Sequence, residues 1–567
     1  MRLSPLVLWL CARALYAAPP EIVKSLDVAV PMRDGVRLSA NIFRRDGPGR
    51  YPTILVRTPY GKGRDVAPHY QDFVEHGYAV MVQDVRGRYR SQGVFRPLEQ
   101  EPADGDDTLN WIARQPWSNG KVGMLGGSYV GIVQWKVAAL NNPHLKAIFP
   151  VVSGDDDYRD RFYSTGGAMK LGQRLLWMSE NLRRPWFHPD PGKFLLHLPL
   201  RSADVAATGQ TLAMYQEALA HPAYDSFWKS ISTRELLDKI RVPVFSVGGW
   251  FDNFVESDLD AYAALRKSSG VDRILIGPWP HNMSSKFDGV DFGPDARVAL
   301  GGIQMQWFDQ FLKNKDTALL SQPPVRIFVM GVNRWQDARE WPPPAQLRHF
   351  YLASRGHANT LAGDGALDPR EPRPQSSRRP PDQFEFDPRN PVPTAGGAIC
   401  CNPKVFPWGP LDQRSVEQRR DVLVYTTAPL KKDLAVIGPV HVVLYAATSA
   451  RDTDFTAKLV DVFPDGRAQT LTDGILRLRY RKSLEKAELV APGEICKLTI
   501  DAGVTGNVFQ KGHRIRMEIS SSNFPRFDRN PNTGRPVADE TELRKASQTI
   551  YHDARRPSQV ILPVVND

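Results

Sequence analysis

A serine in a glycine-rich turn is the first residue of this chain whose setting suggests covalent chemistry. Ser128 lies within Gly126–Gly131, between a predicted strand at 122–125 and a predicted helix at 129–140. This is the setting of a nucleophile elbow, a tight strand-to-helix turn that holds a serine hydroxyl above a sheet. The usual pattern has glycine two positions after the serine, whereas Val130 occupies that position here. An ordinary helix-capping serine is the alternative interpretation.

An aspartate and a histidine follow two further predicted strands. Asp252 comes shortly after the strand predicted at 242–247, and His281 comes shortly after the one at 273–276. A carboxylate so placed can orient a histidine, which serves as a general base near neutral pH. Taken singly, the aspartate could cap a helix and the histidine could be structural. Together with Ser128 they occur in the order Ser, Asp, His of α/β-hydrolases, so the sequence predicts a catalytic triad.

The predicted triad implies two-step acyl transfer. His281 would take the proton of Ser128 as the hydroxyl attacks a carbonyl, while Asp252 holds the imidazole in the required tautomer. Water would then hydrolyse the acyl-enzyme. This chemistry needs neither a metal ion nor an organic cofactor, and we expect none.

The elements around these residues predict an α/β fold. Short apolar strands alternate with helices from 52 to 152 and strands resume at 242, which is typical of a parallel sheet covered on both faces. The intervening segment is rich in Leu and Trp at helical spacing and indicates an inserted cap, which can roof a pocket and exclude water. From about His349 short strands between turn signals predict an all-β sandwich or jelly roll, although 361–393 reads as a long loop.

These patterns divide the 567 residues into several parts, since so long a chain exceeds one hydrophobic core. We expect an α/β-hydrolase domain at 22–154 and 240–345, a helical cap at 155–239 and a jelly-roll domain at 346–567. Residues 1–18 combine a basic start, a short apolar run and small residues, which predicts a secretory signal peptide interrupted by Arg13. A secreted or periplasmic location is therefore expected, with the cytoplasm as the alternative, and no later stretch is long and apolar enough to span a membrane.

Charge and cysteines restrict the partners further. The formal net charge is +11, but the basic residues are scattered and form no stripe or motif, so we do not expect nucleic-acid binding. The four cysteines are Cys11, Cys400, Cys401 and Cys496, and their spacing resembles no zinc site. Adjacent cysteines rarely bond to each other, so we expect either a bond from one of the pair to Cys496 or buried free thiols. The oligomeric state is not indicated.

Several motifs resemble the cocaine esterase / X-Pro dipeptidyl-peptidase group of α/β-hydrolases, which also includes glutaryl acylases and α-amino acid ester hydrolases. The matching stretches are Leu55–Tyr60, Gln83–Arg88, Gly126–Gly131, Gly249–Asp252, Gly277–His281 and Val508–Pro525. The resemblance covers nearly the whole chain after the leader and accounts for Val130. It implies an α/β-hydrolase core, a helical cap and a C-terminal jelly roll. It also implies an oxyanion hole formed by the Tyr60 hydroxyl and the backbone N–H of Tyr129, both suitable donors for a tetrahedral intermediate.

The substrate is less clearly indicated. Amino-ester hydrolases of this group place acidic residues just after the triad aspartate, whereas this chain has Asn253-Phe-Val before Glu256, which argues against α-amino acyl substrates. Trp250 and Phe254 are candidates for an apolar acyl pocket, with core packing as the alternative for both. Asp155–Asp157 could bind an ammonium group, although a solvated acidic turn is the simpler interpretation.

We therefore expect a serine hydrolase that acts on small-molecule or peptide acyl substrates, first an esterase or acylase for apolar or aromatic acyl groups. The second candidate is a dipeptidyl peptidase that releases Xaa-Pro, which carboxylates facing the pocket of Ser128 would favour. A non-catalytic protein that grips carbohydrate with its jelly roll is the third candidate.

Overall fold

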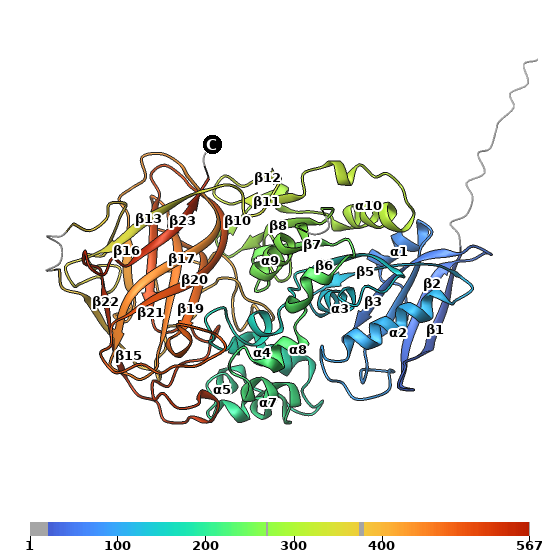
Figure 1. The fold of residues 1–567 in the computed structure, drawn as a ribbon, viewed down its shortest axis with the longest axis horizontal. Coiled ribbons are helices and arrows are strands. Elements are labelled where there is room, and N and C mark those ends of the chain that lie inside the picture. The colour runs from blue at the N-terminus through green and yellow to red at the C-terminus, as the bar shows by residue number, and fades with distance from the viewer. Residues whose placement is uncertain (1–20, 268–269, 374–378, 566–567) are drawn as a thin grey trace, which may run out of the picture.

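The computed structural model describes residues 21–267, 270–373 and 379–565 of the chain (Figure 1). The expected signal peptide at 1–18 and Cys11 lie outside the described residues. Figure 1 shows two parts side by side along the long axis, an N-terminal α/β part and a C-terminal β part. In the part of the chain that is described, no helix is both long and apolar enough to cross a bilayer.

The N-terminal part is built on a ten-stranded sheet in the order β1-β2-β4-β3-β5-β6-β7-β8-β11-β12. Its parallel strands are β3 (Tyr51–Thr58), β4 (Ala79–Asp84), β5 (Ser118–Gly127), β6 (Leu145–Val151), β7 (Phe245–Phe251), β8 (Arg273–Pro280) and β11 (Val325–Val329). Antiparallel strands β1 (Ile22–Pro31), β2 (Arg37–Arg45) and β12 (Arg334–Ala338) extend its two edges. The central strands are buried on both faces, which explains why they read as continuous apolar runs.

Helices cover both faces of this sheet. One face packs against α2 (Glu101–Ala113), α3 (Tyr129–Ala138) and α9 (Val255–Arg266), and the other against α1 (Pro68–Glu75) and α10 (Leu300–Leu312). Successive strand residues divide between the two layers, since Leu55 of β3 belongs to the first core and Ile54 and Val56 to the second. The predicted parallel sheet covered on both faces is confirmed.

Between β6 and β7 the described chain forms helices and no strand. The helices are η1 (Asp157–Phe162), α4 (Leu171–Asn181), α5 (Pro191–Phe194), η2 (Leu200–Ser202), α6 (Ala203–Thr208), α7 (Ala213–Ala220), α8 (Ser226–Ile231) and η3 (Thr233–Lys239). They enclose a core of their own, in which Tyr158 meets Trp228 with ring centroids 5.5 Å apart. Ile399 and Phe406 from the C-terminal part pack into the same core, so the helical insertion is held from two sides.

The C-terminal part is an eleven-stranded, largely antiparallel sheet, as the all-β prediction requires. Its strands are β13 (Gln346–Ala353), β14 (Ala366–Asp368), β15 (Asp382–Phe386), β16 (Leu423–Thr426), β17 (Leu434–Thr448), β18 (Asp454–Val462), β19 (Ala468–Arg477), β20 (Cys496–Phe509), β21 (Arg514–Ser520), β22 (Ala546–Tyr551) and β23 (Gln559–Val564). Short elements outside these layers are β9 (Lys286–Phe287), β10 (Val290–Asp291), η4 (Pro294–Ala296), η5 (Leu319–Ser321), η7 (Leu478–Tyr480) and η8 (Val537–Asp539).

One detail of the sequence prediction was wrong in this part. The segment 361–393 contains the strands β14 and β15, whereas the sequence suggested a long loop. Strand β15 alternates buried and exposed residues and pairs with β22, which lies far along the chain. Its short apolar signal is obscured by the proline and arginine residues around it.

The two parts share a continuous core. The Met330 N–H donates to the Gly506 carbonyl and the Val508 N–H donates to the Met330 carbonyl, so the chain after β11 docks against β20. Trp250, at the end of β7, lies in this shared core: its side chain is 1% exposed and its indole N–H donates to the Phe328 carbonyl at 2.6 Å. Core packing, the alternative considered for Trp250, therefore describes its position.

Candidate active site

Ser128 occupies a strained turn between β5 and α3. Its backbone has φ +56° and ψ −128°, an unfavourable conformation for a residue with a side chain. Glycines permit the close packing around it: a Cβ on Gly126 would lie 2.3 Å from Val130, and one on Gly131 would lie 2.5 Å from the Cβ of Ser153. The second glycine is thus needed opposite Ser153, one position later than in the usual motif.

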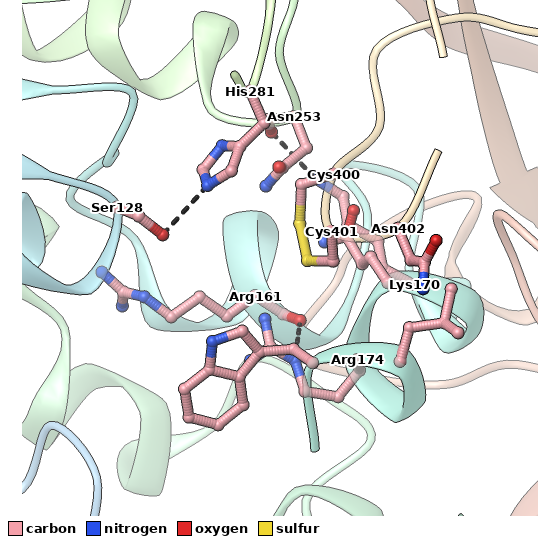
Figure 2. Close-up of a disulfide and its surroundings, with 12 residues drawn as sticks. Ser128, Arg161, Lys170, Arg174, Asn253, His281, Cys400, Cys401 and Asn402 are labelled. Atoms are coloured by element: carbon pink, nitrogen blue, oxygen red, sulfur yellow. Dashed lines mark hydrogen bonds between the residues drawn. A yellow bond between two sulfur atoms is a disulfide. The ribbon is translucent and has the colours of Figure 1, made fainter. Parts of the chain in front are cut away.

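The parallel sheet brings the three predicted triad residues together. They follow β5, β7 and β8, whose carboxyl ends lie at the same edge. His281 Nε2 lies 3.0 Å from Ser128 Oγ, as Figure 2 shows, and its Nδ1 lies 2.6 Å from Asp252 Oδ2. Asp252 is fully buried, and its other oxygen accepts the backbone N–H of Phe254 at 3.0 Å. The carboxylate is thereby fixed against the imidazole.

The two residues expected to stabilise an oxyanion lie beside the serine. The Tyr60 hydroxyl accepts the indole N–H of Trp177 at 3.3 Å. Burial of this hydroxyl raises the pKa of Tyr60, while hydrogen bonds with Trp177 and Ser128 act in the opposite direction, although the residue as a whole is 39% exposed. Tyr129 is the first residue of α3, where backbone N–H groups lack intrahelical acceptors. Two donors therefore lie near Ser128.

The remaining residues singled out from the sequence divide between the site and the core. The ring of Phe254 lies 5.8 Å from the ring of His281, so it borders the site, while Trp250 lies in the shared core described above. The simpler interpretation of Asp155–Asp157 as a solvated turn is wrong, because all three are buried under the cap. Asp157 pairs with Lys136 and Arg161, each at 2.5 Å, and Asp155 pairs with Arg234 at 3.1 Å.

The cysteines differ from the prediction in part: a buried free thiol was one of the two alternatives and holds for Cys496, whereas the bond between the adjacent pair was not expected. Cys400 and Cys401 are bonded to each other, and Cys496 is a buried free thiol whose pKa is raised by burial. Cys401 has φ +101°, a backbone conformation that residue types alone do not reveal. Figure 2 places this disulfide, which comes from the C-terminal part of the chain, close to Ser128 and His281.

Sequence analysis missed three cations of this site. In Figure 2, Arg161 extends toward Ser128, and Lys170 and Arg174 lie around the disulfide. They come from η1 and from the start of α4, and each is at most 8% exposed. Basic residues within an otherwise apolar helical block were the only signal available. Among the described residues, no group of three His, Cys, Asp or Glu side chains could hold a metal ion.

Comparisons with known proteins place this chain in a wider group. Residues 34–283 match the X-Pro dipeptidyl-peptidase (S15 family), and residues 318–561 match the X-Pro dipeptidyl-peptidase C-terminal non-catalytic domain. The chain is 38% identical to cocaine esterase from Rhodococcus sp. (strain MB1 Bresler) over 569 residues, covering 95% of this chain and 98% of the relative.

Two solved structures resemble the whole fold. An aminopeptidase from the marine sediment archaeon Thaumarchaeota archaeon superposes with a TM-score of 0.84 at 26% identity, covering 99% of both chains. An α-amino acid ester hydrolase superposes with a TM-score of 0.84 at 27% identity, covering 99% of this chain and 100% of the other. The sheet, the helical insertion and the β part are therefore arranged together as in these proteins.

Proposed function

Because the chain belongs to the cocaine esterase and S15 family of serine hydrolases, we propose that it cleaves an acyl ester or amide with Ser128, His281 and Asp252. The observation that carries this proposal is the continuous contact from Ser128 Oγ through the imidazole to a buried carboxylate, at 3.0 Å and 2.6 Å. Such a relay is what a serine needs to become a nucleophile near neutral pH.

In the first half-reaction, Ser128 Oγ bonds to the substrate carbonyl carbon while His281 Nε2 takes the hydroxyl proton. Asp252 accepts the Nδ1–H of the imidazole, which leaves Nε2 free to act as the base and stabilises the positive charge that develops. The oxyanion receives hydrogen bonds from the Tyr60 hydroxyl and the Tyr129 N–H. Because the pKa of Tyr60 is raised, its hydroxyl stays protonated and able to donate.

The tetrahedral intermediate then collapses. The carbon–oxygen or carbon–nitrogen bond to the leaving group breaks, and His281 gives its proton to the departing alcohol or amine. In the second half-reaction, His281 deprotonates a water molecule, which attacks the acyl-enzyme and releases the acid and Ser128.

The surroundings of Ser128 favour an esterase or acylase over a dipeptidyl peptidase. A peptidase of that kind must hold a substrate ammonium, for which carboxylates are the natural partners. The labelled lysine and arginine side chains near Ser128 and the disulfide are those of Arg161, Lys170 and Arg174 (Figure 2). The carboxylates of Asp155 and Asp157 already pair with cations of the protein. A carbohydrate-binding protein would have no use for the hydrogen-bonded triad.

The test is hydrolysis of p-nitrophenyl acetate, p-nitrophenyl benzoate and Ala-Pro-p-nitroanilide by the wild type and by Ser128→Ala. We expect ester cleavage by the wild type and its loss in the variant. Ser230→Ala is the matched control, because this exposed cap serine donates to the Phe227 carbonyl instead. Cleavage of the anilide alone would support the peptidase, and full activity of Ser128→Ala would refute the mechanism.

We also propose that the protein is exported from the cytoplasm. The composition of residues 1–18 supports this, as does the Cys400–Cys401 disulfide, since disulfides persist mainly in oxidising compartments. Fractionation of the native host, with N-terminal sequencing of the recovered protein, tests the proposal. Recovery from the cytoplasm with the leader intact would contradict it.

A further inference from the structure

The proposed reaction needs an oxyanion hole with fixed donors, yet one of its two donors comes from a loop. Tyr60 lies just beyond the end of β3, and the residue is 39% exposed. A group that stabilises a transition state must be held to within about 0.5 Å of its productive position. The contacts that hold this loop therefore bear on the rate of the reaction as well as on the stability of the fold.

The turn after β4 holds the Tyr60 loop through an arginine. Arg88 donates its Nε–H to the carbonyl of Pro59, the residue directly before Tyr60, at 3.0 Å. On the other side of the tyrosine, Lys62 donates its backbone N–H at 2.8 Å to Asp84, which ends β4. The loop is thus fixed on both sides of Tyr60 by one short segment of the chain.

The same arginine also contacts the cap. Its Nη2–H donates to the carbonyl of Asn181, the last residue of α4, at 3.2 Å. Carbonyl groups in the last turn of a helix have no intrahelical donor, so this one is free to accept the arginine. From the same helix Trp177 donates its indole N–H to the Tyr60 hydroxyl at 3.3 Å. Helix α4 therefore reaches Tyr60 in two ways, directly at the hydroxyl and through Arg88 at the backbone.

No carboxylate competes for Arg88. Within residues 21–267, 270–373 and 379–565 its guanidinium forms no ion pair, although the side chain is only half-buried. Its other contacts are with the rings of Tyr89 and Phe95, whose centroids lie 5.4 Å and 5.3 Å from its central carbon. The guanidinium is thus committed to two backbone carbonyls, a task that suits its rigid fork of N–H donors.

Other residues hold the second oxyanion donor, the Tyr129 N–H. The buried Tyr129 hydroxyl donates to Glu101 at 2.7 Å, and the Glu101 carboxylate pairs with the buried Arg57 at 2.7 Å. Tyr129 is also the first residue of α3, so the helix fixes its backbone. We therefore expect a change at Arg88 to disturb the Tyr60 donor and to leave the Tyr129 donor in place.

Building on the function proposed above, we propose that Arg88 is a positioning residue of the oxyanion hole. It acts through Tyr60. By holding the carbonyls of Pro59 and Asn181, it keeps the Tyr60 hydroxyl directed at the oxygen that becomes negative when Ser128 attacks. The helical cap thereby sets the position of one oxyanion donor, in addition to covering the site.

The first test compares the hydrolysis of p-nitrophenyl acetate by Arg88→Gln and by the wild type. We expect kcat to fall by about 10-fold and KM to change by less than about 2-fold, because the donor acts mainly on the transition state. Arg88→Lys should recover part of kcat, since an ammonium can reach one carbonyl but cannot bridge both as the fork does. Arg241→Gln is the matched control, because this exposed arginine also donates to two backbone carbonyls, those of Asp238 and Ile240.

A double-mutant cycle separates positioning from a general loss of structure. If Arg88 acts through the Tyr60 hydroxyl, Arg88→Gln should change kcat by less than about 2-fold in the Tyr60→Phe background, where no hydroxyl is left to position. A purely structural role would produce the same loss in both backgrounds. Equal losses in the two backgrounds, or an unchanged kcat in the single variant Arg88→Gln, overturn the inference.

Hydrogen exchange supplies a readout that does not depend on catalysis. In Arg88→Gln the backbone amides of residues 60–63 should exchange faster, because the loop loses one of its anchors, while those of α3 should keep their protection. Unchanged protection of the loop contradicts the inference. Activity that survives Ser128→Ala would refute the proposed function and leave the exchange result standing. Additive losses in an activity that does require Ser128 would overturn only the role of Arg88.

Discussion

His281 Nδ1 lies 2.6 Å from the Oδ2 of Asp252, a carboxylate with no exposed surface. The carboxylate is held from its other side by the Phe254 N–H, so its position depends on the start of α9 as much as on β7. This contact fixes which imidazole nitrogen is free to accept the proton of Ser128.

Asp252→Asn should therefore reduce kcat by about 10³- to 10⁴-fold while KM changes little, because the amide favours the wrong imidazole tautomer. Steady-state kinetics with p-nitrophenyl acetate measure the effect, and a thermal melt checks the fold. A loss below about 10-fold would mean that Asp252 does not orient the base.

Tyr60→Phe should lower kcat by about 10²-fold, since it removes one of two donors to the oxyanion and keeps the ring. KM should change far less, because the donor acts mainly on the charge of the transition state. Tyr70→Phe on α1 is the matched control for loss of a tyrosine hydroxyl. Equal effects of Tyr60→Phe on kcat and 1/KM would point to substrate binding instead.

Gly131→Ala should destabilise the fold by about 1–3 kcal/mol and impair activity, because the new methyl would overlap the Cβ of Ser153. Gly302→Ala on α10 is the comparison, because here the same substitution should increase the free energy of unfolding. Nothing lies within 4 Å of a Cβ there, so alanine should stabilise the helix by about 0.5–1 kcal/mol. Urea unfolding measures both, and a neutral Gly131→Ala would show that the elbow tolerates a wider approach.

The raised pKa of Glu256 predicts how the free energy of unfolding depends on pH. Burial raises the pKa of its carboxyl from 4.5 to about 8, so between these values the folded state binds more protons than the unfolded state. Stability contributed by this group must then fall as pH rises through that window. Glu256→Gln removes the titration, so its free energy of unfolding relative to wild type should rise from pH 5 to pH 8.

Urea unfolding at several pH values measures this difference, and Glu75→Gln on the exposed side of α1 controls for the loss of one surface carboxyl. A difference between Glu256→Gln and wild type that stays constant from pH 5 to pH 8 would exclude the raised pKa.

Much of this architecture is local and could be predicted from sequence. The triad residues each follow an apolar run of the kind that forms a buried strand. Parallel strands of one sheet have their carboxyl ends at the same edge, so three such strands bring Ser128, Asp252 and His281 close together. The helical insertion could likewise be predicted, since it follows from the helical spacing of Leu and Trp within one segment.

The features that escaped prediction depend on contacts distant in the chain. Asp155–Asp157 resembles a solvated turn until the cap and its cations bury it. Trp250 and Phe254 are aromatic neighbours in sequence, yet one faces the β part and the other borders His281. The burial of Arg161 and Arg174 near the disulfide likewise depends on the cap and on the C-terminal part of the chain.

The Cys400–Cys401 disulfide gives the C-terminal half a place beside the nucleophile, although that half supplies no member of the triad. A change confined to the segment around residue 400 would therefore alter the surroundings of Ser128 and His281 while leaving all three triad side chains in place. The two halves of the gene can in this way change the same site independently.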